Sequence, residues 1–213
     1  RREDKRLHRV QWGPGQPRQR TKTWGDPVRW NRQHEAFFSE HGRRQRVFCA
    51  SLADVFDNEV DPRWRRDLFA LIEATPNLVW LLLTKRIGNV IKMQDPKHGG
   101  TRLPANVAIG ATMANQEEYD RDRMKLWAVK EWCQPLFTFG SFEPLLGRVI
   151  LDKHAPDWII VGGESGRTPR PMDLDWARSL RRQSAELGRV FNFKQAGGRD
   201  KGAKTLDGVT HFD

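Results

Sequence analysis

The sequence alternates regularly from Arg46 onward, with short apolar runs separated by longer polar or amphipathic segments. Each apolar run is four to six residues long and lacks a clean alternation with polar residues. Such runs are typical of strands that are buried on both faces of a parallel sheet. The pattern therefore predicts six strands, at residues 47–51, 78–83, 107–111, 136–139, 158–161 and 190–193.

The segments between the predicted strands carry signals for the starts and ends of helices. Asp61 followed by Pro62 supplies a helix cap and a proline at the first helical position. Asn115 and Asp173 are suited to cap two further helices, and Gly188 follows the last of them, where a helix commonly ends. These signals predict three helices that alternate with the strands, and a short fourth helix is expected over residues 30–38.

The helix that follows Asn115 is predicted to run to Trp132. Its large apolar and aromatic residues are Tyr119, Met124 and Trp127. Because side chains of this size are usually buried, we expect all three to face the core.

Strands that alternate with helices indicate an α/β fold with a parallel sheet. A βα barrel, complete or partial, and an open doubly wound sheet both fit this alternation. The sequence contains neither GxGxxG nor GxxxxGK[ST], so no standard nucleotide fingerprint supports the open sheet. The length of 213 residues fits one large domain.

The positive charge of the chain is concentrated at its start. The net charge is +10, and residues 1–46 carry 13 Lys and Arg against 5 Asp and Glu. We therefore divide the chain into a basic, Trp-containing segment over residues 1–45 that packs on the barrel, a partial barrel over 46–198, and a tail over 199–213. A basic segment on a nearly neutral body is suited to DNA or RNA, but it is equally consistent with a solvated surface.

Aromatic residues are interleaved with cations in this basic segment. The tryptophans are Trp12, Trp24 and Trp30, and the cations that we single out as candidates for nucleic-acid binding are Arg18, Arg20, Lys22, Arg29 and Arg32. Aromatic rings can stack on bases while cations neutralise phosphates. The simpler interpretation, which we favour, is that the tryptophans dock the segment onto the core.

Composition excludes several other classes of protein. The two cysteines, Cys49 and Cys133, form no CxxC pair and cannot by themselves hold a zinc or iron–sulfur site. Reduced thiols and a cytoplasmic location are the simplest expectation. No apolar stretch is long enough to span a membrane, so no membrane partner is expected.

Polar or ionisable residues, with a pair of glycines, follow the predicted strands. We select Ser51, Asp54, Lys85, Glu143, Gly162, Gly163, Glu164, Lys194 and Gln195. In parallel α/β folds the ligand site lies at the carboxyl ends of the strands, so these residues are predicted to converge on one site. Each also has a structural interpretation: Asp54 can fix a turn, Lys85 can pair with Glu143 or Glu164, and the glycines can serve tight packing.

Five motifs in a fixed order give the sequence a family resemblance. They are RVFCASLADVF at residues 46–56, LLTKR at 82–86, EPLLG at 143–147, VGGESG at 161–166 and FKQ at 193–195. Together they resemble the phage-associated three-cysteine-motif family of radical-SAM-like proteins, which is distantly similar to spore photoproduct lyase. The resemblance extends over most of the chain.

The resemblance implies a partial βα barrel, a [4Fe–4S] cluster and S-adenosylmethionine. By position, it implies that Ser51, Asp54, Lys85, Glu143 and Glu164 face the cofactor. Gly162 and Gly163 join this cofactor-binding set because glycines after a strand allow backbone amides to approach an adenosyl group. Lys194 and Gln195, at the last strand, would lie nearer the substrate and are the predicted catalytic residues.

The three clustered cysteines of that family are not present, and its first strand and cluster loop are expected to be missing from this chain. The chain is then either a fragment, which we favour because a missing strand would expose a sheet edge, or a degenerate member. Three functions follow. They are a radical-SAM-type enzyme acting on a phage or host macromolecule such as nucleic acid, a cluster-free nucleic-acid-binding scaffold, and an accessory subunit whose open barrel edge pairs with a protein partner.

Overall fold

The computed structural model describes residues 16–18, 20, 24–49, 53–95, 100, 102–199 and 202–211. Six strands form one sheet in the order in which they occur along the chain, and all neighbours are parallel. They are β1 (Arg46–Cys49), β2 (Val79–Thr84), β3 (Val107–Thr112), β4 (Thr138–Phe142), β5 (Trp158–Gly162) and β6 (Val190–Gln195). All six predicted strands are therefore confirmed, although β4 begins two residues later than the apolar run, which leaves Leu136 46% exposed before the strand.

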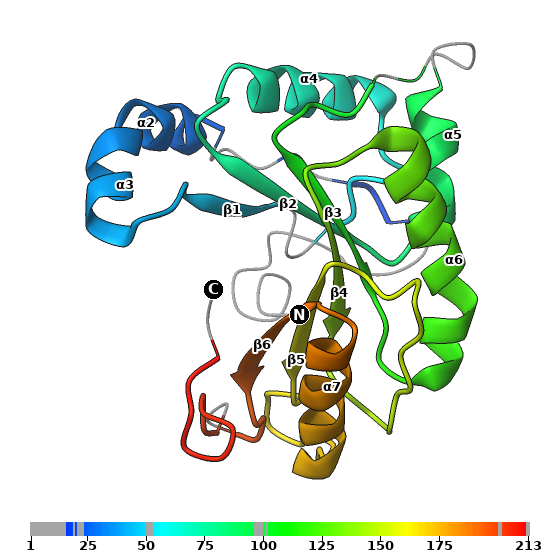
Figure 1. The fold of residues 1–213 in the computed structure, drawn as a ribbon. Helices are drawn as coiled ribbons and strands as arrows, with labels where there is room; N and C mark the ends of the chain where they lie inside the picture. Colours follow the sequence, from blue (N-terminus) through cyan, green and yellow to red (C-terminus); the bar gives the residue numbers. More distant parts are fainter. Residues whose placement is uncertain are drawn as a thin grey trace.

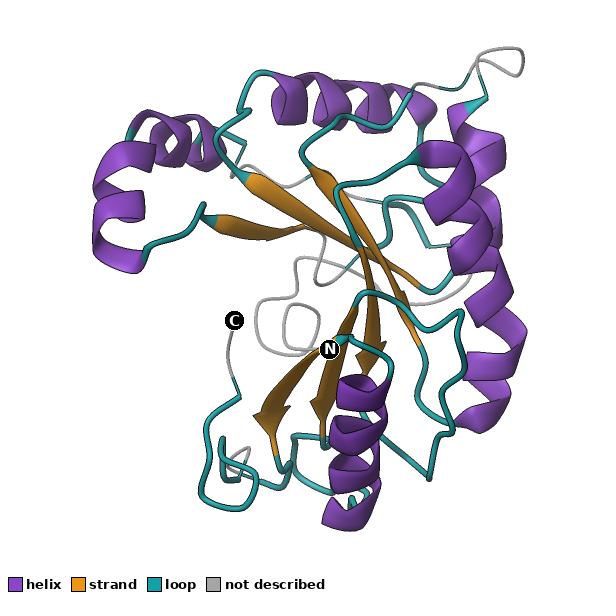
Figure 2. Ribbon diagram, in the orientation of Figure 1, coloured by secondary structure: helices purple, strands orange, loops and turns teal. Residues whose placement is uncertain are grey.

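The sheet curls into a half-barrel, and the helices α4 to α7 lie along its convex side (Figure 1, Figure 2). A doubly wound sheet would require a reversal of strand order and helices on both faces. The sequential order β1 to β6 has no such reversal, which decides between the two arrangements that the sequence left open. Within the described residues β1 and β6 pair on one edge only, so the barrel is partial.

The helices begin and end largely at the predicted signals. They are α2 (Asp26–Arg32), α3 (His34–His41), α4 (Pro62–Glu73), the 3₁₀ turn η1 (Ile87–Asn89), α5 (Val90–Gln94), α6 (Gln116–Cys133) and α7 (Leu174–Glu186). The carboxylates of Asp61 and Asp173 and the amide oxygen of Asn115 each accept a hydrogen bond from a backbone N–H of the first turn, as predicted. Gly188, at φ +63°, follows α7. The single short helix expected over residues 30–38 is instead two helices, α2 and α3.

Both faces of the sheet are apolar, which explains the uninterrupted apolar runs. Side chains on the convex face, such as Leu82 and Ile109, pack against the helices. A second cluster, from alternate positions that include Leu81 and Phe139, lies on the concave face. Gly110 accommodates this cluster, because a Cβ at Gly110 would lie 2.2 Å from the ring of Phe139.

The structure contradicts the expected burial of two residues on α6. Tyr119 is buried, but Met124 is 42% exposed and Trp127 is 40% exposed. The buried face of α6 includes Tyr119 and Leu126. Met124 lies five residues after Tyr119, about 140° around the helix, and therefore points outward. None of the helices in the described ranges combines the length and apolar character needed to cross a membrane.

Candidate functional site

The carboxyl ends of the parallel strands define one rim of the half-barrel. The register places Ser141 beside Thr112 and beside Ile160, all on the concave side of the sheet. Glu143 lies two residues beyond Ser141 and so continues toward this rim. Between Val161 and Gly162 the pairing of β5 with β6 shifts register. The rim therefore brings together residues from three adjacent strands, β4, β5 and β6.

A pair of opposite charges, Glu143 and Lys194, lies on this rim. The Lys194 ammonium donates to Oε2 of Glu143 over 2.7 Å, and the Lys194 side chain is 56% exposed. The other carboxylate oxygen, Oε1, is buried and has no hydrogen-bond partner in the described part of the chain. A buried carboxylate oxygen without a donor is costly, by about 1–3 kcal/mol. Within the described residues Glu143 therefore keeps an unsatisfied acceptor at the rim, and a ligand reaches it only when the atoms that cover Oε1 move aside.

Close packing accounts for the glycine pair of the VGGESG motif. A Cβ at Gly163 would lie 2.1 Å from the backbone oxygen of Ala196, and one at Gly162 would lie 3.1 Å from Oε1 of Glu143. Gln195 is hydrogen-bonded to Gly163 on both sides of the peptide. Its backbone oxygen accepts from the Gly163 N–H at 2.9 Å, and its side-chain amide donates to the Gly163 oxygen at 3.1 Å. These contacts match the structural interpretation of the glycines, and Gln195 is engaged within the protein.

Glu164 is held by an arginine that the sequence patterns did not single out. Arg170 binds both carboxylate oxygens of Glu164, at 2.7 and 3.0 Å, and its backbone N–H donates to the same group. The hydrogen bond to Glu164 raises the pKa of Arg170 above its usual value. The pairing suggested for Lys85, with Glu143 or Glu164, is thus replaced by Lys194 and Arg170.

Asp54 joins two loops at the other end of the rim. Its carboxylate accepts from the Thr84 hydroxyl at 2.8 Å, the backbone N–H groups of Phe56 and Lys85 at 3.0 Å each, and the Arg86 guanidinium at 3.2 Å. These four donors come from the loop after β1 and from the end of β2. The carboxylate of Asp54 is therefore used to build the rim. The side chain of Lys85 is exposed and makes no ion pair with any described residue.

Asp57 extends this network towards the basic segment. Burial by itself would raise the pKa of Asp57, but the Glu59 N–H and the positive charges of Arg86 and Arg18 outweigh burial and lower it. Arg18 lies 3.1 Å from Asp57 and 2.6 Å from Glu59. This arginine therefore ties the basic segment to the loop that precedes α4.

The other arginines proposed to contact nucleic acid differ in whether they form ion pairs within the protein. Arg20 binds Asp67 at 2.7 Å and lies 3.8 Å from the centre of the Trp24 ring, while Arg29 binds Asp26 at 3.2 Å. The exposed Arg32 makes no ion pair within the described ranges. Lys22, and the predicted cofactor residue Ser51, lie outside the described residues.

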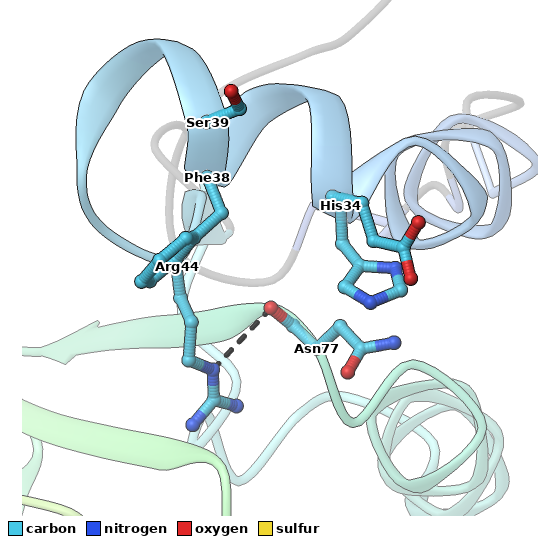
Figure 3. A pocket seen from close by; sticks show the side chains of 6 residues that line it. His34, Phe38, Ser39, Arg44 and Asn77 are labelled. Atoms are coloured by element: carbon cyan, nitrogen blue, oxygen red, sulfur yellow. Dashed lines mark hydrogen bonds between the residues drawn. The ribbon is translucent and has the colours of Figure 1, made fainter.

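A shallow hollow of about 340 Å³ lies at the opposite end of the sheet, between α3 and the start of β2 (Figure 3). It is lined by His34, Glu35, Phe38, Ser39, Arg44 and Asn77. Arg44 donates to the backbone oxygens of Asn77 at 3.3 Å and Leu78 at 2.8 Å. These contacts join the segment between α3 and β1 to the residues that precede β2. The amino ends of strands commonly serve stability in such folds, so we place the candidate site at the opposite rim.

Comparison with models of protein families identifies the family of this chain. A family model described as a protein of unknown function, DUF5131, matches residues 2–211. The chain belongs to the DUF5131 family. Comparison with curated proteins and with solved structures gave no match. The half-barrel and its rim are thus the fold of a DUF5131 protein.

The described cysteines of this DUF5131 chain do not fit an iron–sulfur cluster. Such clusters bind through several cysteine thiolates, and the described residues contain no group of three or more His, Cys, Asp or Glu that could hold a metal. Cys49 and Cys133 are both free thiols. Burial raises the pKa of Cys49 to about 12, which disfavours the thiolate form. Neither cysteine is therefore assigned to a cluster.

Proposed function

We propose that this DUF5131 protein binds S-adenosylmethionine on the concave rim of its half-barrel and acts on a nucleic acid of phage or host. The observation that carries the proposal is the buried Oε1 of Glu143, which has no hydrogen-bond partner among the described residues, beside the Lys194 ammonium. The order of the five motifs supports it, because their resemblance to radical-SAM-like proteins implies the same cofactor.

The methionine end of S-adenosylmethionine is chemically complementary to this pair. It carries an ammonium group, which can donate to Oε1 of Glu143, and a carboxylate, which can accept from Lys194. The ammonium of Lys194 has three donors, of which one is used by Glu143. Leu83 and Ile160 lie partly exposed on the concave face and offer apolar surface to the adenosyl group.

Calorimetric titration of the purified protein with S-adenosylmethionine tests the proposal. We expect saturable binding by the unchanged protein and at least about tenfold weaker binding by Glu143→Gln, which corresponds to about 1.4 kcal/mol. Glu73→Gln removes an exposed carboxylate from α4 and serves as the matched control. Absence of binding at millimolar ligand, or equal affinity for Glu143→Gln and the unchanged protein, would contradict the proposal.

A second candidate is a nucleic-acid-binding scaffold that uses no cofactor. It is favoured by Arg29 and Arg32, which are both exposed on the last turn of α2 within the basic segment. Binding of a fluorescent single-stranded oligonucleotide should then weaken steeply between 50 and 200 mM salt. Reversal of both charges, in Arg29→Glu with Arg32→Glu, should weaken it further. Unchanged binding by this double variant would exclude α2 as the contact surface.

A further inference from the structure

The hollow beside α3 carries an exposed aromatic ring. Its volume of about 340 Å³ lies within the range of about 300–1,000 Å³ that is usual for ligand pockets. Phe38, which lines it, is 54% exposed, although phenyl rings are usually buried. The ring contact that forms within α3 joins Phe37 to His41 and does not involve Phe38. The ring of Phe38 is therefore available to stack on a flat ligand.

Asn77 lines the same hollow and contributes to the fold through its backbone. Its backbone oxygen accepts from Arg44 at 3.3 Å, and its backbone N–H donates to the side-chain oxygen of Asn31 at 2.9 Å. The carboxamide of Asn77 makes no hydrogen bond with any described residue, and Figure 3 shows it on the side of the hollow that also carries His34. A carboxamide offers a donor and an acceptor, which match the edge of a nucleic-acid base.

Two further side chains of α3 supply acceptors to the hollow. Nδ1 of His34 lies 2.9 Å from the backbone oxygen of Asn31. Because a carbonyl oxygen only accepts, we assign the proton of the neutral ring to Nδ1, which leaves Nε2 as an acceptor. The exposed carboxylate of Glu35 makes no ion pair in the part of the chain that the structure describes. Both groups are suited to accept from the N–H groups of a base.

Positive charge without a carboxylate partner lies beside the hollow. Arg44 gives its hydrogen bonds to backbone oxygens of residues 76–78. Arg43 lies against an aromatic ring, 5.5 Å from its centre, and Arg32 lies two residues before His34. None of these three arginines forms an ion pair within the described ranges. Guanidinium groups in this state attract the phosphates of a nucleic acid.

The other arginines of the basic segment do not share this surplus. Arg18, Arg20 and Arg29 each pair with a carboxylate of this chain. The unpaired charge among the described arginines of the segment is therefore concentrated around the hollow. An aromatic ring, a free carboxamide and unpaired cations together form the combination that proteins use to bind single strands.

We propose that this hollow binds one unpaired base of a single-stranded nucleic acid. The base stacks on Phe38 and is hydrogen-bonded to the carboxamide of Asn77, and the neighbouring phosphates lie beside Arg32 and Arg43. The inference rests on the proposed action on nucleic acid and gives that action a docking site. The hollow holds the strand at the amino ends of the sheet strands, and the opposite rim keeps its role as the place for chemistry.

Fluorescence anisotropy of labelled single strands tests the proposal. One probe is a short thymidine oligonucleotide, and the other is a strand of equal length in which every base is replaced by a stable abasic sugar. The unchanged protein should bind the abasic strand at least about fivefold more weakly. Phe38→Ala should weaken binding of the thymidine strand by a similar factor and leave the abasic strand unaffected.

Asn77→Ala should weaken binding of the thymidine strand about threefold. Circular dichroism should stay unchanged, because the contacts of Asn77 within the protein use its backbone. Trp132→Ala is the control, because it removes an exposed ring from α6, on the far side of the molecule from α3 (Figure 1). Tight binding of the thymidine strand by both hollow variants, equal to that of the unchanged protein, would overturn the docking site and leave the proposed action on nucleic acid standing. Absence of binding to either strand would contradict both.

Arg43→Ala separates the phosphate contact from the base contact. It should weaken the thymidine and abasic strands by the same factor and reduce the dependence of binding on salt, because phosphates are present in both strands. Weakening of the thymidine strand alone would contradict the placement of Arg43 beside a phosphate.

Discussion

The two ends of the rim use a carboxylate in opposite ways. At the β1–β2 end, Asp54 accepts hydrogen bonds from four groups that come from two loops. At the β4–β6 end, Glu143 accepts from Lys194 through Oε2 and has no partner among described residues at the buried Oε1. Both acids follow a strand, and the sequence resemblance assigns both to the cofactor. Position after a strand therefore does not distinguish an acid that builds the rim from one that keeps an oxygen without a donor among the described residues.

Removal of the carboxylate at the β1–β2 end should cause the largest loss of stability. Asp54→Ala leaves the Thr84 hydroxyl and two backbone N–H groups without their acceptor, so we expect a loss of about 3 kcal/mol in the free energy of unfolding. Urea denaturation measures the loss. Glu73→Ala is the control, because Glu73 is exposed. A loss no larger than that of the control would show that Asp54 does not hold the two loops.

Close packing constrains the glycine pair at the β4–β6 end of the rim. Gly163→Ala forces a Cβ against the Ala196 oxygen, so the free energy of unfolding should fall by about 2–3 kcal/mol. Gly147→Ala is the matched control, because nothing lies within 4 Å of the Cβ added there. If Gly163→Ala folds as stably as the control but loses S-adenosylmethionine, the glycine serves the ligand and the packing account is wrong.

The β4–β6 end should show the smallest effect on stability. Glu143→Gln removes a charge from a pair whose lysine is largely exposed, so the free energy of unfolding should change by less than about 1 kcal/mol. Urea denaturation of this variant, beside Asp54→Ala, gives the contrast directly. A loss at Glu143 as large as the loss at Asp54 would make both acids structural.

The strands and helix starts could be predicted because they depend on local pattern. Runs such as residues 78–83 are apolar on both faces, and Asp61 caps its helix through a backbone group two residues away. The partners of the rim residues could not be predicted in the same way. Lys194 reaches Glu143 across 51 residues of sequence, and it does so where β5 and β6 shift register. The spacing of apolar residues along the sequence does not predict such a shift of register.

Helix α6 shows a second limit of sequence patterns. The sequence identifies Met124 and Trp127 as apolar positions, and the general preference of such residues for burial predicts that they face the core. The fold buries one face of α6 only, the face that carries Tyr119. The positions of apolar residues show which of them share a side of the helix, but not which side the fold buries.

A crystal structure of the protein with S-adenosylmethionine would show which end of the rim holds the ligand. We predict that a nitrogen or hydroxyl donor of the ligand lies within about 3.2 Å of Oε1 of Glu143, with Asp54 still bound to Thr84 and Arg86. Ligand bound at the Asp54 end, with Oε1 of Glu143 left without a donor from the ligand, would contradict it.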